Sequence, residues 1–250
     1  MENVQKFTGR ASDYAVGRPF YSMQLIDFLY EHYINDKSVI ADIGCGTGKF
    51  TKQLLDKGNF VYGVEPNKDM QSVALEELAE YKNFELINGT AENTDIKPCS
   101  VDFITVAQAF HWFGADEFHK ECKRILKPNG YVALIWNTRD ISAPLNKDSY
   151  DIYKKYCIEF KGFGGGVADD SSNIKHFFDN EYKYIEFNNP LEFTKDKFIK
   201  RSLSASYSIK QDNVYFMDYK RELEEIFDKY ADTGKLIMPN KTVAYIGKCK

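Results

Sequence analysis

The sequence lacks the features that place a protein in a membrane or in an oxidising compartment. It has no run of apolar residues long enough to span a bilayer, and its first residues, MENVQK, lack the apolar core of a signal peptide. Its five cysteines are odd in number and have no C-x-x-C spacing, which argues against both a disulfide framework and a zinc site. We therefore expect a cytoplasmic protein with reduced thiols and no membrane partner.

Histidine and net positive charge are also scarce. The four histidines, His32, His111, His119 and His176, contain no i, i+4 pair and no cluster with cysteine, so the sequence predicts no metal site. Magnesium bound by scattered carboxylates stays open. The formal net charge of −4 gives no general attraction for duplex nucleic acid and leaves only a local basic patch as an alternative. We expect a small-molecule partner, no nucleic-acid partner, and a monomer or homodimer.

A glycine-rich run, VIADIGCGTG at 39–48, is the most informative feature that the sequence does contain. Its apolar residues predict a buried strand that stops in a loop with Gly44, Gly46 and Gly48 and continues as a helix. Such a loop can hold an anionic or polar cofactor against bare backbone. Glycine suits it because a side chain would block close approach, and because the turn can require positive φ. A tight turn without a ligand would account for one or two of these glycines.

The spacing of the glycines separates two classes of nucleotide cofactor. A dinucleotide fingerprint would have its third glycine at the position of Lys49, whereas this chain has it at Gly48. Asp42 stands two residues before Gly44 and completes the pattern acid-x-Gly-x-Gly-x-Gly. This pattern resembles motif I of the class I S-adenosylmethionine-dependent methyltransferases. The resemblance implies S-adenosyl-L-methionine as the cofactor and S-adenosyl-L-homocysteine as the product.

The wider sequence resembles the small-molecule branch of that family, which includes trans-aconitate methyltransferase-like proteins of the methyltransferase type 11 kind. The resemblance implies methyl transfer to a small molecule, with a carboxylate or hydroxyl oxygen as the expected acceptor. Two alternatives stay open: a nicotinamide-dependent oxidoreductase, against which Lys49 argues, and a non-catalytic cofactor-binding module with the same fold. The segments that carry the resemblance are Phe7, Arg10, Ala11, Tyr14, Arg18, Pro19, 107–113, 124–130 and 204–207.

Residues after the second and third predicted strands complete a candidate cofactor site. Glu65 follows Gly44 by 21 residues, and a carboxylate there can accept both hydroxyl hydrogens of a ribose. The resemblance implies that Ala91 and Glu92 meet the adenine and that Met70 packs on its face, although Met70 can also belong to the core. The predicted cofactor-binding residues are Asp42, Gly44, Cys45, Gly46, Gly48, Glu65, Pro66, Met70, Ala91, Glu92, Ala107 and Gln108.

The end of the fourth predicted strand is the expected position of the methyl donor, because ligands of open α/β sheets bind beyond the carboxyl ends of the strands. A carboxylate acceptor loses no proton, so Arg18 or Arg139 could orient it. A hydroxyl or amine acceptor would instead use His111 as a general base, unless His111 is structural. The candidate substrate pocket comprises Tyr14, Arg18, Trp112, Arg139 and Tyr207, whose aromatic members could equally be core residues.

The alternation of apolar runs and amphipathic segments predicts a Rossmann-like, doubly wound α/β fold. We expect a seven-stranded, mainly parallel sheet with helices on both faces, and the resemblance implies that its last strand is antiparallel. The predicted strands are 38–43, 60–65, 84–88, 101–107, 131–136, 182–187 and 242–247. The predicted helices are 22–35, 48–57, 68–81, 115–127, 147–160, one that begins at Thr194, and 213–231, with turns or loops at 127–130 and 162–166.

We expect these elements to form a single methyltransferase domain over residues 1–250. Residues 1–35 would be an N-terminal cap or lid, and 36–140 would be the cofactor-binding core. A variable, substrate-side insertion would occupy 141–215, and 216–250 would contribute the final helix and strand.

Overall fold

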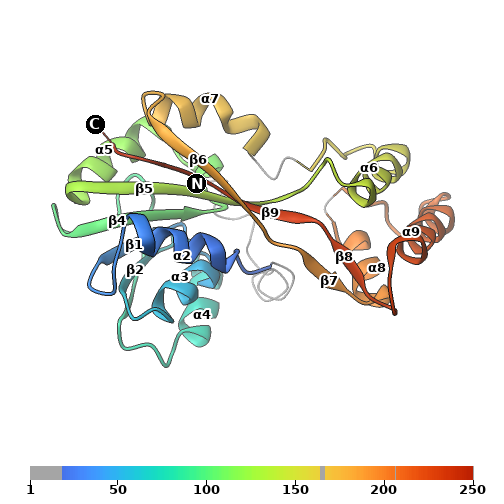
Figure 1. Cartoon of the computed structure of the whole chain (residues 1–250), viewed down its shortest axis with the longest axis horizontal. Coiled ribbons are helices and arrows are strands. Elements are labelled where there is room, and N and C mark those ends of the chain that lie inside the picture. The colour runs from blue at the N-terminus through green and yellow to red at the C-terminus, as the bar shows by residue number, and fades with distance from the viewer. Residues whose placement is uncertain (1–18, 164–166, 206, 250) are drawn as a thin grey trace. The chain divides into compact units, whose positions relative to one another are not determined.

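The computed structural model describes residues 19–163, 167–205 and 207–249 (Figure 1). Contacts group these residues into two compact units. The first, which we call the sheet unit, comprises 19–136, 167–187 and 242–249. The second, which we call the helical unit, comprises 137–163, 188–205 and 207–241. The predicted lid lies mostly outside the described residues, and the predicted division into core and insertion stays a prediction.

A seven-stranded sheet organises the sheet unit, as predicted. Its strands are β1 (Val39–Ile43), β2 (Phe60–Val64), β3 (Phe84–Ile87), β4 (Val101–Ala107), β5 (Leu126–Arg139), β6 (Tyr182–Asn188) and β9 (Asn240–Gly247). Their order is β3-β2-β1-β4-β5-β9-β6. The pairs β3-β2, β2-β1, β1-β4 and β4-β5 are parallel, whereas β9 runs back toward the C-terminus, opposite to β5 (Figure 1).

The strand order fixes where a ligand can bind. The chain adds β2 and β3 on one side of β1 and then returns to lay β4 against its other side. Such a reversal leaves a crevice beyond the carboxyl ends of the two central strands, where open α/β folds hold their ligands. The glycine loop follows β1, and residues 108–113 follow β4, so both predicted segments begin at this edge.

Helices cover both faces of this sheet (Figure 1). They are α2 (Met23–His32), α3 (Lys49–Leu55), α4 (Lys68–Glu77), α5 (Ala115–Ile125) and α7 (Val167–Phe177), with the short 3₁₀ helix η2 (Phe110–Trp112). Neighbouring residues of β4 show how the two faces are filled: Phe103 packs with α2 and α3, whereas Ile104 packs with α5 and α7. Both side chains are fully buried, as expected for a strand covered on both faces.

The amphipathic segments that we expected to be helices bury their apolar residues. Met70, Ala74 and Leu78 are buried under α4, and Phe118 and Cys122 are buried under α5. The helix expected at 22–35 begins one residue later, and Ser22 holds the N-cap position of α2 without a capping hydrogen bond from its side chain.

The predicted turn at 127–130 is wrong, because these residues belong to β5. Leu126 pairs with Val101, and the register then shifts, so that Tyr131 pairs with Phe103. The extra residues form an irregular step in which Asn129 adopts a φ of 72°, a conformation that asparagine tolerates. Asn-Gly therefore supplies a bulge inside a strand where we expected a turn between elements.

Four elements lie where we predicted other boundaries or no element. The helix expected at 147–160 is α6 (Pro144–Tyr156), which starts earlier because its proline occupies the first turn. No helix was expected at α7, whose sequence contains two Asp and two Ser residues of low helix propensity at 169–172. The hairpin strands β7 (Leu191–Phe193) and β8 (Leu236–Met238) are three residues each, too short to show an alternating pattern. The loop at 162–166 lies only partly within the described residues.

The helical unit has its own core. It contains α6, α8 (Lys195–Leu203), α9 (Phe216–Tyr230) and the antiparallel hairpin β7-β8. Tyr153, Phe198, Tyr219 and Leu223 are fully buried within it, and the last two lie on α9, the helix expected at 213–231. Thr194 is the N-cap residue of α8, but its side chain makes no capping hydrogen bond.

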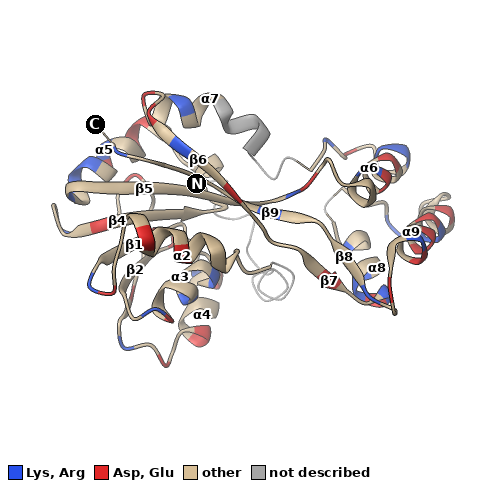
Figure 2. Ribbon diagram, in the orientation of Figure 1, with Lys and Arg blue, Asp and Glu red and all other residues tan. Residues whose placement is uncertain are grey.

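Charged residues of both signs alternate on the outer faces of α6 and α9 (Figure 2). Two ion pairs join these helices: Lys155 Nζ lies 2.6 Å from Glu222 Oε1, and Lys229 Nζ lies 2.7 Å from Asp148 Oδ2. Each pair is at least partly exposed, so each contributes little, on the order of 0–1 kcal/mol. In the part of the chain that the structure describes, no helix has the length and apolar character needed to cross a membrane.

Candidate functional site

The glycine loop is hydrogen-bonded to the carboxyl end of β2. The backbone N–H groups of Gly44 and Cys45 both donate to the carbonyl oxygen of Val64, at 2.8 and 3.1 Å. Gly48 N–H closes the turn by donating to Cys45 O at 2.9 Å, and α3 begins at the next residue. These hydrogen bonds hold the loop at the carboxyl end of β1, beside the end of β2.

The three glycines of the loop are required for different reasons. All have positive φ: 69° at Gly44, 57° at Gly46 and 80° at Gly48. A Cβ on Gly44 would lie 2.6 Å from Ala109 Cβ, and one on Gly48 would lie 2.7 Å from Leu78 Cδ1. A Cβ on Gly46 would meet no described atom within 4 Å, so Gly46 is the position at which bare backbone faces open space.

Glu65 lies directly against this open position. Its Oε2 accepts a hydrogen bond from Gly46 N–H at 3.0 Å, and its Oε1 accepts one from Asn67 N–H at 2.8 Å. The side chain is buried, with 8% of the residue's surface exposed. Burial raises the pKa of Glu65, and the two backbone hydrogen bonds oppose that effect.

Asp42 is fully buried below the loop. Its Oδ2 accepts a hydrogen bond from Thr51 Oγ1 at 2.6 Å, and its Oδ1 accepts one from Thr105 Oγ1 at 2.8 Å. Burial raises the pKa of Asp42 to about 6, against the effect of these hydroxyl donors. The carboxyl group therefore links the strand before the loop, the helix after it and β4.

Two polar residues that we did not predict support the site. Asn67 Oδ1 caps α4 by accepting from the N–H groups of Asp69 and Met70, at 3.0 and 3.1 Å. Gln71 Nε2 donates to Glu65 O at 2.6 Å and to Asn88 Oδ1 at 2.9 Å. The Asn-x-Asp pattern at the start of a helix is an N-cap signal that could have identified Asn67. Gln71 has no such local signal.

The other residues predicted for the adenine end lie nearby in the chain but differ in exposure. Met70 and Ala91 are buried, at 3% and 5% exposure, and Pro66 is partly exposed. Glu92 is partly exposed, and its Oε1 accepts a hydrogen bond from Gly114 N–H at 2.9 Å. Glu92 thereby connects the segment after β3 with the segment after η2.

The chain leaves β4 through a residue with unusual backbone geometry. Gln108 directly follows Ala107, the last residue of β4, and has a φ of 58°, which is uncommon for a residue other than glycine. Its N–H donates to Ile135 O at 2.9 Å, which fixes it to β5. The turn brings Ala109 against Gly44 of the glycine loop. Strain of this kind is concentrated at functional sites.

His111 and Trp112 lie on η2, immediately after this turn. Their ring centroids are 4.6 Å apart, with an angle of 49° between the rings. His111 is partly buried, whereas Trp112 is 37% exposed. An exposed indole next to a strained turn can form one wall of a binding site.

The remaining predicted pocket residues belong to other parts of the chain. Arg139 and Tyr207 are in the helical unit, where the Arg139 guanidinium lies 4.1 Å from the centre of the Phe163 ring and 5.6 Å from that of Tyr153. Burial raises the pKa of Tyr207 to about 12, and the charge of Arg139 opposes this shift. Tyr14 and Arg18 lie outside the described residues, as does Ser206 of the 204–207 segment.

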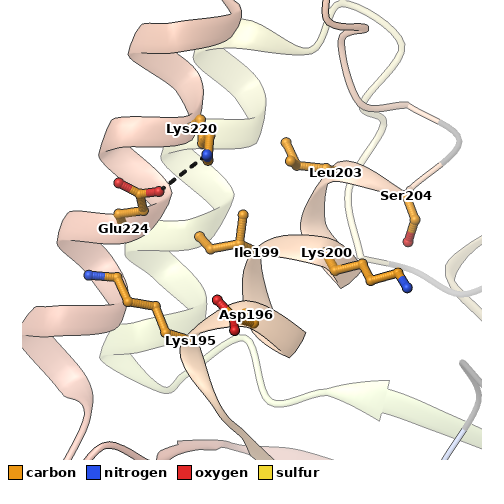
Figure 3. A pocket seen from close by; sticks show the side chains of 8 residues that line it. All are labelled: Lys195, Asp196, Ile199, Lys200, Leu203, Ser204, Lys220 and Glu224. Carbon is orange, nitrogen blue, oxygen red and sulfur yellow. Dashed lines mark ion pairs between the residues drawn. The ribbon is translucent and has the colours of Figure 1, made fainter.

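A groove in the helical unit contains none of the predicted site residues (Figure 3). It has a volume of about 520 Å³ and lies between α8 and α9. Its lining is Lys195, Asp196, Ile199, Lys200, Leu203, Ser204, Lys220 and Glu224. Lys220 and Glu224 pair across 3.7 Å, and Lys195 pairs with Asp228, so acids of the same surface already neutralise two of its three lysines.

Possible metal ligands do not gather in the described part of the chain. No group of three or more His, Cys, Asp and Glu side chains is placed there to hold an ion. Two histidines instead join α5 to α7, because His176 Nε2 lies 2.8 Å from Asp116 Oδ1 and His119 Nδ1 lies 2.9 Å from Phe177 O.

Comparison with known proteins gives a family match over the region that contains the glycine loop. The family model described as "Methyltransferase domain" matches residues 41–134, which begin in β1 and end in β5. An uncharacterised methyltransferase of Mycobacterium tuberculosis is 30% identical over 240 residues, which cover 95% of this chain and 93% of that protein.

Other relatives share only part of their length with this chain. An uncharacterised methyltransferase-like protein of Schizosaccharomyces pombe is 33% identical over 144 residues, and the match spans 55% of its length. Among solved structures, a protein from Anaeromyxobacter dehalogenans described as a type II methyltransferase aligns with a TM-score of 0.61 at 20% identity, covering 93% of this chain and 98% of that one. This structural match concerns the fold alone, and it agrees with the predicted architecture.

Proposed function

Because this chain belongs to the class I S-adenosylmethionine-dependent methyltransferases, we propose that it transfers the methyl group of S-adenosylmethionine to an oxygen atom of a small molecule. The comparisons give no support to the nicotinamide alternative, since the relatives and the family model are all described as methyltransferases. The acceptor and its oxygen are our proposal, as is turnover itself.

The contact between Glu65 and Gly46 is the observation that carries the proposal. A nucleoside needs an anchored carboxylate for its ribose hydroxyls and bare backbone beside it, and these two residues supply both within 3.0 Å. The open space at Gly46 fits a ligand that approaches the loop closely. Asn67 N–H holds the carboxylate in place, so Glu65 need not reorganise to accept the ribose.

We propose that the remaining cofactor-binding residues contact different parts of the cofactor, according to the strand that each of them follows. Gly44, Cys45 and Gly48 shape the loop, and Pro66 and Met70 lie at the adenine end. Ala91 and Glu92 would meet the adenine edge, and Ala107 and Gln108 the methionine end. Because the carboxyl group of Asp42 is fully buried and bonded to two threonines, we propose that it positions the loop and does not touch the cofactor.

The proposed reaction needs alignment more than acid–base chemistry. S-adenosylmethionine held by these residues would supply a methyl group on a sulfonium, which an acceptor oxygen could take while the electron pair of the broken C–S bond stays with sulfur. If that oxygen is a carboxylate, no proton leaves. If it is a hydroxyl, His111 would remove the proton, and Trp112 would exclude water. Tyr14, Arg18, Arg139 and Tyr207 remain the proposed contacts to the acceptor.

Titration calorimetry with S-adenosylhomocysteine and with NAD tests the cofactor. We expect binding of the first and none of the second, and tight NAD binding alone would overturn the proposal. Incubation with methyl-labelled S-adenosylmethionine and a cell extract then tests turnover. Transfer of label to a small organic acid or alcohol supports it, whereas cofactor binding without transfer to any metabolite would favour the non-catalytic module.

We also propose that the protein works in the reducing cytoplasm, as a monomer or homodimer. All five cysteines are free, and Cys45, Cys122 and Cys157 are buried. The Cys45 thiol lies in the glycine loop, where burial raises its pKa well above the usual range and keeps it a neutral thiol.

A further inference from the structure

Two of the five cysteines lie in contact within the sheet unit. Cys122 is on α5 and is fully buried, whereas Cys249 follows β9 and is partly exposed. The two thiols are hydrogen-bonded to each other, and Cys249 packs against the apolar cluster that contains Cys122. The segment that follows β9 accordingly lies beside α5 (Figure 1). The fold therefore brings together two thiols that are far apart in the sequence.

Contacts of the neighbouring residues hold the end of β9 where Cys249 can reach α5. Lys248 Nζ donates to Asn129 Oδ1 at 3.3 Å, in the irregular step of β5. A Cβ on Gly247 would lie 2.6 Å from Phe178 Cδ1, so the chain is packed tightly just before Cys249. These contacts involve residues other than the two cysteines, and they fix the position of this segment independently of the thiols.

One thiol of the pair can be reached by a solute, and the other cannot. Cys249 is partly exposed, so a dissolved oxidant can reach its sulfur atom. Burial raises the pKa of the Cys122 thiol well above its usual range, so Cys122 by itself is an unreactive, neutral thiol. An accessible thiol beside a second, resolving thiol is the arrangement found where proteins form reversible disulfides.

Little movement is needed to join the two sulfur atoms. They already lie within hydrogen-bonding reach of each other, and a disulfide requires them at about 2.05 Å. Cys249 lies two residues beyond the last residue of β9, so its backbone can adjust without breaking the strand. Cys122 is held in the interior of a helix turn of α5, so Cys249 is the residue that moves.

We propose that Cys122 and Cys249 form a reversible disulfide when the protein meets a peroxide, and that this bond fastens the end of β9 to α5. The sulfur of Cys249 takes one oxygen from hydrogen peroxide, which gives a sulfenic acid and releases water. The sulfur of Cys122 then attacks the sulfur of Cys249, and the hydroxide that leaves takes the proton of the Cys122 thiol to form a second water. Two thiols lose two electrons, and one peroxide gains them.

The bond is a response to oxidation and not a permanent cross-link. Reducing compartments keep thiols reduced, and the disulfides that do form there are usually transient. While it lasts, a bond between distant parts of the sequence restricts the unfolded chain and so stabilises the fold. This inference concerns the sheet unit alone and does not depend on methyl transfer.

Peptide mapping of the full chain after treatment with hydrogen peroxide tests the pair. Without reductant, mass spectrometry should show the peptides of Cys122 and Cys249 linked, and dithiothreitol should separate them. Cys249→Ser should abolish the link. Cys99→Ser is the matched control and should form the link as the parent does, because Cys99 is exposed and its N–H donates to Arg124 O at 3.0 Å, near the same end of α5.

The melting temperature measures the consequence of the bond. The oxidised parent should melt at least about 5 °C above the reduced parent, since the disulfide closes a long loop. Oxidised and reduced Cys249→Ser should melt at the same temperature. Equal melting temperatures for the two forms of the parent would overturn the fastening of β9 to α5.

Three products of the peroxide treatment would contradict the pair. Cys249 recovered only as a sulfinic or sulfonic acid would show that no second thiol reaches it. A link from Cys249 to Cys99 would identify a different partner, and a link between two molecules would identify a reaction between copies. The map of the parent decides among these outcomes without any variant. A parallel titration keeps the proposed function separate, because linked peptides without S-adenosylhomocysteine binding would refute that function and leave the thiol pair intact.

Discussion

Glu65 Oε2 accepts a hydrogen bond from the backbone N–H of Gly46 at 3.0 Å, so the acid after β2 and the middle glycine of the loop form one unit. This contact joins two segments that stand 19 residues apart. The hydrogen bond orients the Glu65 carboxylate, and the Gly46 backbone that donates it is also the part of the loop that a ligand would approach. Changes at either residue should therefore affect binding more than folding.

Replacing Glu65 with Gln keeps the shape of the side chain and removes its charge. We expect affinity for S-adenosylhomocysteine to fall by about 1–3 kcal/mol, the range for losing a charged hydrogen-bond partner. Titration calorimetry measures this, and Glu76→Gln on the exposed side of α4 is the control. Unchanged affinity in Glu65→Gln would remove Glu65 from the ribose site.

The same residue should make binding depend on pH. Burial raises the pKa of Glu65, and a protonated carboxyl accepts hydrogen bonds from ribose hydroxyls less well. Affinity of the parent should therefore decline on acidification toward this raised pKa, whereas that of Glu65→Gln should change less. Parallel slopes for the two proteins would mean that another group controls the pH dependence.

Gly46→Val tests whether the open position in the loop is the ligand's approach. Valine would place its side chain in the space that Gly46 leaves free and would also strain a φ of 57°. Gly58→Val separates these effects, because Gly58 has a φ of 96° and equally open surroundings outside the loop. The melting temperature should fall by a similar amount in both variants, and only Gly46→Val should lose cofactor binding. A normal dissociation constant for Gly46→Val would contradict the motif assignment.

Asp42 gives a pH dependence of stability with a defined sign. The folded protein holds this proton with a pKa of about 6, whereas the ordinary value is 3.8, so between about pH 4 and 6 the folded state binds more protons than the unfolded chain. The free energy of unfolding therefore falls as the pH rises through this window, by up to about 3 kcal/mol from this group. Asp42→Asn should remove that slope.

Denaturant unfolding at pH 4.5 and 7, for the parent and the variant without cofactor, measures the difference. The exposed Asp36→Asn should follow the parent curve. If the slopes of the parent and Asp42→Asn agree across the window, the raised pKa of Asp42 is wrong.

The fold and the glycine loop could be predicted from the sequence because both depend on local patterns of residue types. Apolar runs at β1, β4 and β5 identify buried strands, and Gly44, Gly46 and Gly48 identify a turn with positive φ. The direction in which a side chain points could not be predicted from such local patterns. Nothing local in the sequence indicates that Asp42 points inward to Thr51 and Thr105, 9 and 63 residues away.

Features that depend on distant partners were missed for the same reason. Gln71 supports Glu65 through a bond to its backbone, and the irregular step at Asn129 depends on pairing with β4. The φ of 58° at Gln108 could not be predicted, because left-handed backbone is expected from glycine and here a glutamine adopts it. Tertiary contacts determine each of these three features, and the local conformational propensities of the residues do not.

His111→Ala tests whether the histidine on η2 takes part in chemistry. If His111 is a general base, the turnover of a hydroxyl acceptor should fall far more than affinity for S-adenosylhomocysteine. The rate of methyl transfer from labelled cofactor measures the first quantity and calorimetry the second. His176→Ala, on the exposed side of α7, should leave both unchanged. Parent-like turnover in His111→Ala would show that His111 is structural or that the acceptor is a carboxylate.

We expect Gln108 to lower the stability of the fold and to support cofactor binding. Its left-handed backbone costs about 1–2 kcal/mol that glycine would not incur, although glycine adds entropy to the unfolded chain. We therefore expect Gln108→Gly to raise the free energy of unfolding by up to about 1 kcal/mol. The same substitution should weaken S-adenosylhomocysteine binding several-fold, because it removes a side chain at the proposed methionine end and loosens the turn that lies against Gly44.

Thr233→Gly provides the matched comparison, because Thr233 is exposed and has a φ of 48° in the turn before β8. It should gain a similar amount of stability with no change in affinity. Denaturant unfolding and calorimetry on both variants give the two quantities independently. If Gln108→Gly gains stability and keeps full affinity, the strain at the end of β4 serves the fold alone, and the methionine end of the cofactor must be held by other residues.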